Sequence, residues 1–307
     1  MISIVIPLYN KEADIASTLK SVLAQTYQDF EIIVIDDGST DNSTTEVKKF
    51  NDSRIRLISQ FNAGVSAARN RGIEEAQFNY IAFLDADDEW LPEYLSVIYS
   101  LITKYPNCNV YATSYTIQNN SSSTMVQLQG LSFSSPDGIL DNYFSVATKN
   151  LPPLWTSAVC AKKESLQNIG GFPIGIKSGE DLLTWAKLSI HNGIAYSKQN
   201  MSIYHNEIQA WEPGRPVSDI DVVGNELLCL IPIVQKESLQ SYKYYIAHWY
   251  GMRASTFLRH KKRFKAFKEV LKALRMRFFY PKIFVFLLLT LTPDSIIRKA
   301  FKYREAV

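Results

Sequence analysis

The sequence of 307 residues predicts an α/β fold, with a mostly parallel sheet flanked by helices and a helical C-terminal extension. Three observations predict it. Short apolar runs alternate with segments of helical periodicity through the first hundred residues. The apolar runs end in polar and acidic residues, as strands do at the ligand-binding edge of an open α/β sheet. From Asp219 onward the pattern is almost entirely helical.

The first part of the chain justifies this fold element by element. Each expected strand is a short apolar run, and each expected helix repeats apolar residues three and four positions apart. Strands are expected at residues 3–8, 31–35, 55–59, 80–84 and 109–117, and helices at 14–23, 64–76 and 92–105. Because the two kinds of segment alternate, neighbouring strands are expected to pair in parallel.

The middle of the chain is less regular. Residues 119–124 form a polar cluster that predicts a hairpin or surface loop. Residues 155–161 are interpreted as a strand, and the Gly-Gly-Phe-Pro stretch within 169–173 as a helix stop and turn. A helix is expected at 180–190, and the Pro-Gly-Arg-Pro stretch at 213–216 predicts a domain boundary near residue 215.

The cysteines and the first residues indicate a cytoplasmic protein. Cys108, Cys160 and Cys229 are scattered, with neither metal-binding spacing nor a disulfide framework, which suits a reducing compartment. Residues 1–7 lack a basic segment and a long apolar stretch, so they are interpreted as a first strand and not as a signal peptide.

The net charge of +3 conceals an asymmetry along the chain. Residues 251–307 hold 15 Lys and Arg against 3 Asp and Glu, a net charge of +12. The remaining 250 residues hold 18 against 27, a net charge of −9. An acidic body with a basic tail predicts an anionic partner, either nucleic acid or an anionic membrane surface.

The clearest chemical feature is the strand at residues 80–84, which runs directly into Asp85, Asp87 and Asp88. Carboxylates gathered at one strand end repel one another unless a cation compensates them, and hard divalent ions prefer oxygen ligands. This favours a site for a metal ion and a diphosphate. The alternative is a solvated acidic loop that caps the next helix, since Pro92 suits a first helical turn.

The ends of the first two strands, at residues 7–12 and 36–41, are expected to flank one crevice. A nucleotide base there needs an acceptor for a ring N–H, which Asp37 offers, and a flat surface, which Tyr9 offers. The alternative for residues 36–41 is a helix N-cap, where Asp and Ser are favoured.

Residues 62–72 open a helix with small side chains, as a backbone that approaches a nucleotide closely requires. Arg69 could reach a phosphate or ribose, or fix an aspartate of the acidic cluster. The alternative is close helix–sheet packing with a surface arginine. The stretch is not a phosphate-binding Walker loop, because the Gly-Lys-Ser/Thr ending is absent.

Taken in order, the motifs at residues 7–10, 36–41, 62–70 and 84–88 resemble the inverting nucleotide-sugar glycosyltransferases of family 2, which have the GT-A fold. The resemblance covers roughly residues 1–200 and is densest in the first 105. It implies a catalytic domain at 1–215, with a nucleotide-sugar half at about 1–105 and an acceptor half at about 106–215. Residues 216–307 then form the basic helical region.

The resemblance also implies roles for the donor-side residues. Asp37 would bind the base, usually uracil, with Pro7 and Tyr9 lining the pocket. Glu12, Gly64 and Arg69 would complete the nucleotide-sugar site.

The acidic cluster matches the DxD element of the family. Asp85 would face the ribose or sugar and contribute to the metal site, and Asp87 would ligate Mg²⁺ or Mn²⁺ bridging the diphosphate. Asp88 is left between second ligand and helix cap.

Residues 178–181 resemble the family's "ED" motif. Transfer with inversion needs a carboxylate opposite the leaving group to deprotonate the acceptor hydroxyl. This implies Asp181 as the general base and Glu180 as a residue that orients the acceptor. The alternative is a pair of acidic residues that stabilise a helix N-terminus.

Further along the chain, His205 is a candidate for metal or diphosphate binding, although a lone histidine is more often structural. Residues 211–215, from Trp211 to Arg215, form either an acceptor-side lid or a linker. Trp90 and Trp155 could line the acceptor cleft, with a core role as the default.

The basic tail mixes cations with aromatic residues at 259–268 and then has nine apolar residues at 283–291. That run is too short to span a hydrocarbon core of about 30 Å, which needs about 20 residues. Basic amphipathic segments around a short apolar run suit an interfacial anchor on anionic lipid. The alternative is a helical bundle with a solvated basic face. Nucleic acid is disfavoured, since no recognition motif accompanies the charge.

The sequence therefore predicts a metal-dependent inverting glycosyltransferase. It would move a sugar from a nucleotide-diphosphate donor, with UDP expected, to a glycan or lipid-linked glycan in bacterial surface polysaccharide synthesis. The expected location is the inner face of the cytoplasmic membrane, and assembly into a homo-oligomer is left open. The alternatives are a sugar nucleotidyltransferase and a catalytically silent, membrane-associated binding protein.

Overall fold

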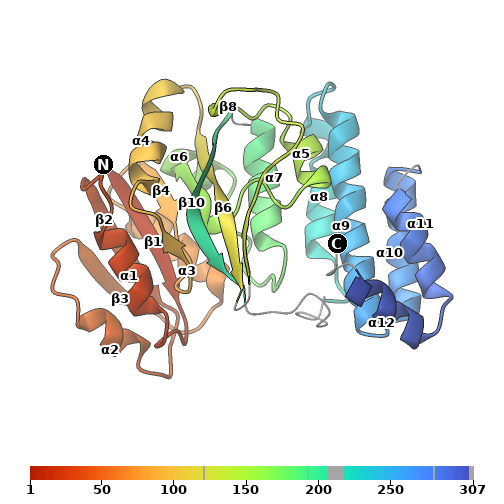
Figure 1. The fold of residues 1–307 in the computed structure, drawn as a ribbon, viewed down its shortest axis with the longest axis horizontal. Coiled ribbons are helices and arrows are strands. Elements are labelled where there is room, and N and C mark those ends of the chain that lie inside the picture. Colours follow the sequence, from red (N-terminus) through yellow and green to blue (C-terminus); the bar gives the residue numbers. More distant parts are fainter. Residues whose placement is uncertain (120–121, 192, 207–217, 279–280, 304–307) are drawn as a thin grey trace.

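The computed structural model describes residues 1–307 except 120–121, 192, 207–217, 279–280 and 304–307 (Figure 1). In this part of the chain one ten-stranded sheet has the order β3-β2-β1-β4-β9-β6-β10-β5, with β7 beside β6 and β8 beside β10. The predicted α/β class, with a helical C-terminal region, is confirmed.

The strands and helices alternate through the first two thirds of the chain. The strands are β1 (Ile2–Leu8), β2 (Phe30–Asp36), β3 (Ile55–Ser59), β4 (Tyr80–Phe83), β5 (Glu89–Trp90), β6 (Val110–Asn119), β7 (Ser122–Met125), β8 (Asp137–Ile139), β9 (Val159–Lys162) and β10 (Ile194–His205). The α-helices are α1 (Ile15–Leu23), α2 (Ser43–Lys48), α3 (Val65–Glu75), α4 (Tyr94–Lys104), α5 (Tyr143–Lys149), α6 (Lys163–Asn168), α7 (Glu180–His191), α8 (Val222–Cys229), α9 (Leu239–Arg259), α10 (Arg263–Met276), α11 (Pro281–Thr290) and α12 (Asp294–Tyr303). Two short 3₁₀ helices are η1 (Thr156–Ala158) and η2 (Ile231–Ile233).

The four N-terminal strands of the sheet pair in parallel, as predicted. Every residue of β1 and β2 is buried, because helices cover both faces of the sheet. This double cover explains why both strands are continuous apolar runs and do not alternate with polar residues. One hydrophobic core lies under α1 and α4, and the larger one lies under α3, α5 and α7.

Strand β9 is antiparallel to both neighbours and joins β4 to β6. The expected strand at residues 155–161 is therefore partly wrong, because residues 156–158 form a 3₁₀ turn and the strand is Val159–Lys162. The reason is that Ser157 bonds the acidic loop and not a neighbouring strand. Its hydroxyl donates to Asp88 Oδ2 at 2.5 Å, and its carbonyl accepts from Trp90 Nε1 at 2.6 Å.

The C-terminal helices belong to the larger core and do not stand apart from it. Helix α9 packs against α5, and α10 and α11 pack against α9 (Figure 1, right). The boundary expected at residues 213–216 lies outside the described residues. Within those described, no helix combines the length and the apolar character needed to cross a membrane.

One close approach between helix and sheet depends on a glycine. Gly72 of α3 faces the buried Val5 of β1, and a Cβ atom at this position would overlap both methyl groups of Val5. We expect Gly72→Ala to lower the free energy of unfolding by about 1–3 kcal/mol, as overpacking does, although alanine alone favours a helix. Urea unfolding measures the loss, and the double variant with Val5→Ala should recover part of it. A Gly72→Ala protein as stable as the wild type would contradict this packing.

Candidate active site

The predicted site residues gather where β1, β2 and β4 end, at the lower edge of the sheet in Figure 1. Helix α1 fixes the acidic loop there, because Thr18 Oγ1 donates to the carbonyl oxygens of Ala86 and Asp88, both at 2.9 Å. Helix α1 thus anchors the backbone of the loop after β4. The three aspartates of this loop contact other segments of the site: Asp85 pairs with Arg69, Asp87 pairs with Lys11, and Asp88 bonds Ser157.

Asp37 closes a loop over the end of β2. Its Oδ1 accepts from Gln60 Nε2 at 2.8 Å and from Ala63 N at 2.9 Å, and its Oδ2 accepts from Gly64 N at 2.8 Å. A carboxylate oxygen can accept two hydrogen bonds, so Oδ2 retains one acceptor position for a ligand. Gln60 was not anticipated from the sequence, which offered only the small residues after it.

The end of β1 provides one exposed aromatic ring and one structural carboxylate. Pro7 lies within the buried strand, whereas Tyr9 is half-exposed. Glu12 ties two loops together, since its Oε2 accepts from Asn42 N at 2.8 Å and its backbone N–H donates to Asp41 Oδ2 at 3.1 Å. The structure therefore gives Glu12 a loop-binding role, and the predicted contact with the nucleotide stays a prediction.

Arg69 is the buried cation at the centre of the site, 3% exposed. One terminal nitrogen lies 2.7 Å from Asp85 Oδ1, and the other lies 3.8 Å from Glu180 Oε1. The guanidinium group also stacks over the ring of Phe172 at 5.1 Å. Arg69 thus fixes an aspartate of the acidic cluster, which is one of the two roles that the sequence left open. It also links the loop after β4 to the start of α7.

Asp87 pairs with Lys11, for which the sequence predicted no role. Lys11 Nζ lies 2.6 Å from Asp87 Oδ2, and both side chains are 36% exposed. Lys11 stands in the motif after β1, so its proximity follows from the pairing of β1 with β4.

A divalent cation fits this site only when substrate phosphates supply some of its ligands. No group of three His, Cys, Asp or Glu side chains is placed to hold a metal within the described ranges. His205 Nε2 lies 3.5 Å from Glu89 Oε1, and Asp85 is engaged by Arg69. The partly exposed Asp87 carboxylate suits the mode in which Mg²⁺ is bound by one or two carboxylates together with substrate phosphates.

Asp88 is neither an exposed ligand nor a helix cap. Helix α4 begins at Tyr94 with Glu93 as its N-cap residue, and Asp88 is 1% exposed. Its carboxylate accepts from Ser157 Oγ, from Trp155 Nε1 at 3.3 Å and from the His205 backbone N–H at 3.3 Å. Burial, followed by the charge of Asp85, raises the pKa of Asp88 to about 8. Asp88 therefore binds the acidic loop to β10 and to the segment before β9.

The second acidic pair occupies the first turn of α7, as predicted. Asp181 Oδ1 accepts from Leu182 N at 2.7 Å. Burial raises the pKa of Asp181 above its usual range, against the opposing effects of that hydrogen bond and of Arg69. Burial also raises the pKa of Glu180, and the neighbouring charge of Asp181 adds to this effect. Both shifts favour proton acceptance nearer neutral pH.

The C-terminal helix α9 supports this pair from behind. Gly179 has φ +85°, and a Cβ atom there would lie 2.5 Å from Cη2 of Trp249. Tyr245 of α9 donates to the carbonyl oxygen of Leu182 at 3.1 Å. No sequence pattern indicated these contacts, because more than sixty positions separate the partners.

The two tryptophans named from the sequence have structural contacts. Trp90 is buried and stacks on Tyr94 at 4.1 Å. Trp155 stacks on Tyr115 at 5.4 Å and lies 4.2 Å from the ring of Tyr204. Trp90 Nε1 also donates to the carbonyl oxygen of Ser157 at 2.6 Å, and Trp155 Nε1 donates to Asp88 Oδ2 at 3.3 Å. Trp211 and Arg215 lie outside the described residues.

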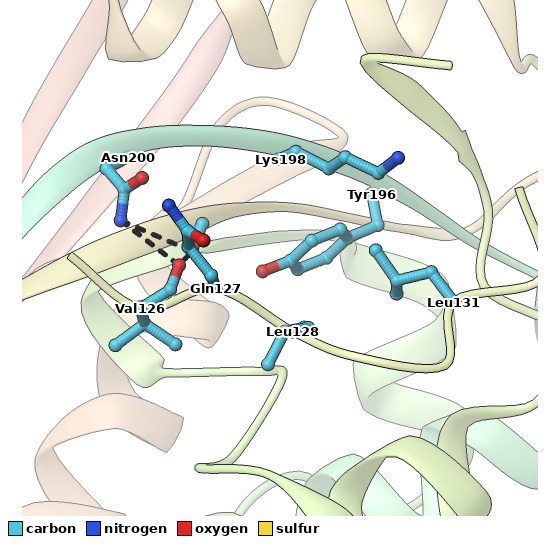
Figure 2. Close-up of a pocket in the computed structure, with 8 residues that line it drawn as sticks. Val126, Gln127, Leu128, Leu131, Tyr196, Lys198 and Asn200 are labelled. Carbon is cyan, nitrogen blue, oxygen red and sulfur yellow. Dashed lines mark hydrogen bonds between the residues drawn. The ribbon is translucent and has the colours of Figure 1, made fainter. Parts of the chain in front are cut away.

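A separate cavity of about 340 Å³ lies on the β6–β10 part of the sheet (Figure 2). It is lined by Ser114, Val126, Gln127, Leu128, Leu131, Tyr196, Lys198 and Asn200. Asn200 Nδ2 bonds the carbonyl oxygen of Val126 at 3.3 Å across it. None of these residues belongs to the acidic site.

Comparisons with known proteins identify the family and the fold. The family model described as Glycosyl transferase family 2 matches residues 3–164. The UDP-Glc:alpha-D-GlcNAc-diphosphoundecaprenol beta-1,3-glucosyltransferase WfgD of Escherichia coli is 39% identical over 122 residues, which are 39% of this chain and 48% of WfgD. Glycosyltransferase GlyA of Streptococcus pneumoniae is 42% identical over 106 residues, 34% of this chain and 15% of GlyA. The chain thus matches less than half the length of either relative.

Among solved structures, S. aureus TarS 1–349 in complex with UDP-GlcNAc has a TM-score of 0.60 at 18% identity. The match covers 91% of this chain and 92% of that chain. At this identity the likeness establishes the fold alone.

Proposed function

The chain belongs to glycosyl transferase family 2, and we propose that it transfers a sugar with inversion from a UDP-sugar to a hydroxyl group of a glycan or lipid-linked glycan. The observation that carries the proposal is the placement of Arg69 between Asp85 and Glu180. This one buried side chain brings the donor-side loop and the acidic pair of α7 into a single site. The names of WfgD and of the TarS complex support UDP as the nucleotide.

The donor would bind at the ends of β1 and β2. Asp37 Oδ2 keeps one acceptor position for a ring N–H of the base, and the half-exposed Tyr9 offers a flat surface beside it. The Asp37 carboxylate is oriented in advance by its three hydrogen bonds to residues 60–64. Such orientation lowers the cost of ordering the site when the ligand arrives.

Asp181 would act as the general base. The acceptor hydroxyl loses its proton to Asp181 while its oxygen forms a bond to the anomeric carbon. The bond between that carbon and the diphosphate oxygen breaks, and the nucleoside diphosphate leaves with the electron pair. The raised pKa of Asp181 suits this proton transfer, and Glu180 beside it would orient the acceptor.

Asp87 would hold a divalent cation, Mg²⁺ or Mn²⁺, together with the diphosphate, and Asp85 and His205 would complete the site. When bound, the cation would stabilise negative charge on the leaving group. Lys11 must then release Asp87, which the partial exposure of both side chains allows.

This release predicts a competition that can be measured without turnover. We expect Lys11→Met to lower the Kd for Mn²⁺ about two- to fivefold in the donor-free protein, because an exposed ion pair contributes about 0.2–1 kcal/mol. Calorimetric titration with Mn²⁺ checks this. Lys20→Met, which removes an exposed lysine from α1, is the matched control. Unchanged or weaker Mn²⁺ binding by Lys11→Met would show that Lys11 does not compete for Asp87.

The acceptor is proposed by class. The name of WfgD specifies a sugar on diphosphoundecaprenol, a lipid-linked acceptor. A similar acceptor would place this chain in bacterial surface polysaccharide synthesis, at the inner face of the cytoplasmic membrane.

A screen of nucleotide sugars with Mn²⁺ tests the proposed function. We expect slow release of UDP from at least one UDP-sugar without acceptor, and faster release with a lipid-linked glycan. If the protein instead released pyrophosphate from UTP when a sugar phosphate was supplied as the second substrate, it would be a nucleotidyltransferase. Absence of both binding and hydrolysis across the screen would reject the proposal.

A further inference from the structure

The outer face of α11 is apolar and uncovered in the structure. Phe284, Val285 and Leu288 repeat at helical spacing, and Leu291 follows directly after the helix. Leu288 and Leu291 are 65% and 77% exposed. Residues on the opposite side of the helix, such as Ile283 and Phe286, are buried in the core. A helix that is apolar on all sides is normally buried, so its open half requires a partner.

Helix α10 extends this surface with a stripe that alternates apolar and basic side chains. Phe264, Lys268, Leu271 and Arg275 are all exposed and recur every three or four positions. Phe278, which follows α10, meets Phe284 of α11 with ring centroids 6.4 Å apart. We call the following exposed side chains the hairpin face: Phe264, Lys268, Leu271, Arg275, Phe278, Phe284, Val285, Leu288 and Leu291. Figure 1 shows the two helices side by side at the edge of the molecule.

The acidic side chains near this face are paired, whereas several of its basic side chains are not. The acidic residues within 251–303 are already paired, Glu269 with Arg253 at 3.0 Å and Asp294 with Arg263 at 2.6 Å. Lys268, Arg275 and Lys282, by contrast, have no carboxylate within 4.0 Å among the residues that the structure describes. The hairpin face therefore combines exposed apolar groups with uncompensated positive charge.

We propose that the hairpin face docks on an anionic lipid surface. The side chains of α11 enter the boundary between headgroups and acyl chains, and the cations of α10 meet lipid phosphates. A second copy of the chain fits poorly, because a two-fold contact would bring the same lysines and arginines against one another. Nucleic acid fits poorly as well, since it offers no apolar surface for Leu288 and Leu291.

Vesicle binding by the full chain tests the proposal. We expect co-sedimentation with vesicles of equal parts phosphatidylglycerol and phosphatidylcholine, and little with phosphatidylcholine alone. Leu288→Ser, and separately Lys268→Glu with Arg275→Glu, should each weaken binding about tenfold or more. The matched controls are Ile139→Ser on β8 and Lys20→Glu with Lys48→Glu on α1 and α2, which should bind as the wild type does.

Two outcomes would overturn the proposal. One is equal binding by the hairpin-face variants and their controls. The other is a wild-type dimer in light scattering that Leu288→Ser converts to a monomer, without binding to vesicles. Hydrolysis of a soluble UDP-sugar without vesicles should be unchanged in all variants, so a failure of docking is distinguishable from a failure of the proposed function.

Discussion

Replacing Asp181 by asparagine should lower the rate of sugar transfer by about a thousandfold, within the range that general bases contribute. The amide keeps the size of the side chain, and its oxygen can still accept from Leu182 N, the 2.7 Å bond at the start of α7. It cannot accept the acceptor's proton. Binding of UDP should stay within about twofold of the wild type, since the proposed role of Asp181 is on the acceptor side.

Initial rates at saturating donor and acceptor, with calorimetry for UDP, measure the two effects. Glu180→Gln is the matched variant, one position earlier in the same helical turn. It should lose less activity, because Glu180 is proposed to orient the acceptor and not to accept the proton. An Asp181→Asn enzyme that keeps most of its activity, beside an inactive Glu180→Gln, would move the base to Glu180.

The pH dependence gives a second measure of the same group. A base must be deprotonated to act, so the rate falls as pH falls through its pKa. Burial raises the pKa of Asp181, and the acid limb of the wild-type profile is therefore expected above the usual range of an aspartate. The residual activity of Asp181→Asn should lack this limb.

Arg69→Met should lower the free energy of unfolding by about 3–5 kcal/mol, the cost of removing one partner from a buried ion pair. Methionine can occupy the apolar space over Phe172, but it leaves Asp85 and Glu180 without their cation. The same variant should lose transfer activity, because the pKa values of the acidic pair would rise further and the loop after β4 would lose its anchor. Urea unfolding measures the stability term.

Arg71→Met is the matched control on the same helix. Arg71 pairs with Glu74 and Glu75 at the surface, with 48% of its side chain exposed, so its loss should change stability by no more than about 0.5 kcal/mol. Adding Glu180→Gln to Arg69→Met should restore part of the stability by removing one unpaired charge. Equal effects of Arg69→Met and Arg71→Met would contradict the central role of Arg69.

Much of the fold was predictable because the N-terminal strands are doubly covered. Burial on both faces makes β1 and β2 continuous apolar runs, which a sequence pattern reveals directly. Strand β10 was not predicted, because Ser197, Asn200 and Ser202 interrupt its apolar pattern. Ser197 and Ser202 are buried, and Asn200 bonds Tyr115 and Val126 across to the neighbouring segment. Short helices such as α5 offer too few turns to show a period.

The candidate site divides in the same way. Asp37, Asp85 and Asp87 could be anticipated because they directly follow buried strands. The pairing of Lys11 with Asp87 could not, since an ion pair between two loops depends on strand order and not on local pattern. Asp88 lies beside two anticipated residues, yet its environment comes from Ser157 and Trp155, nearly seventy positions away.

The contact between Gly179 and Trp249 has a consequence for how such a chain can be divided. The family match ends at residue 164, before the acidic pair and before the helix that supports it. A chain shortened after β10 would keep the motifs that the family match covers. It would lose Trp249, whose indole lies against Gly179 just before Asp181. Exchanging C-terminal regions between relatives would therefore also change the packing behind Gly179, two residues before Asp181.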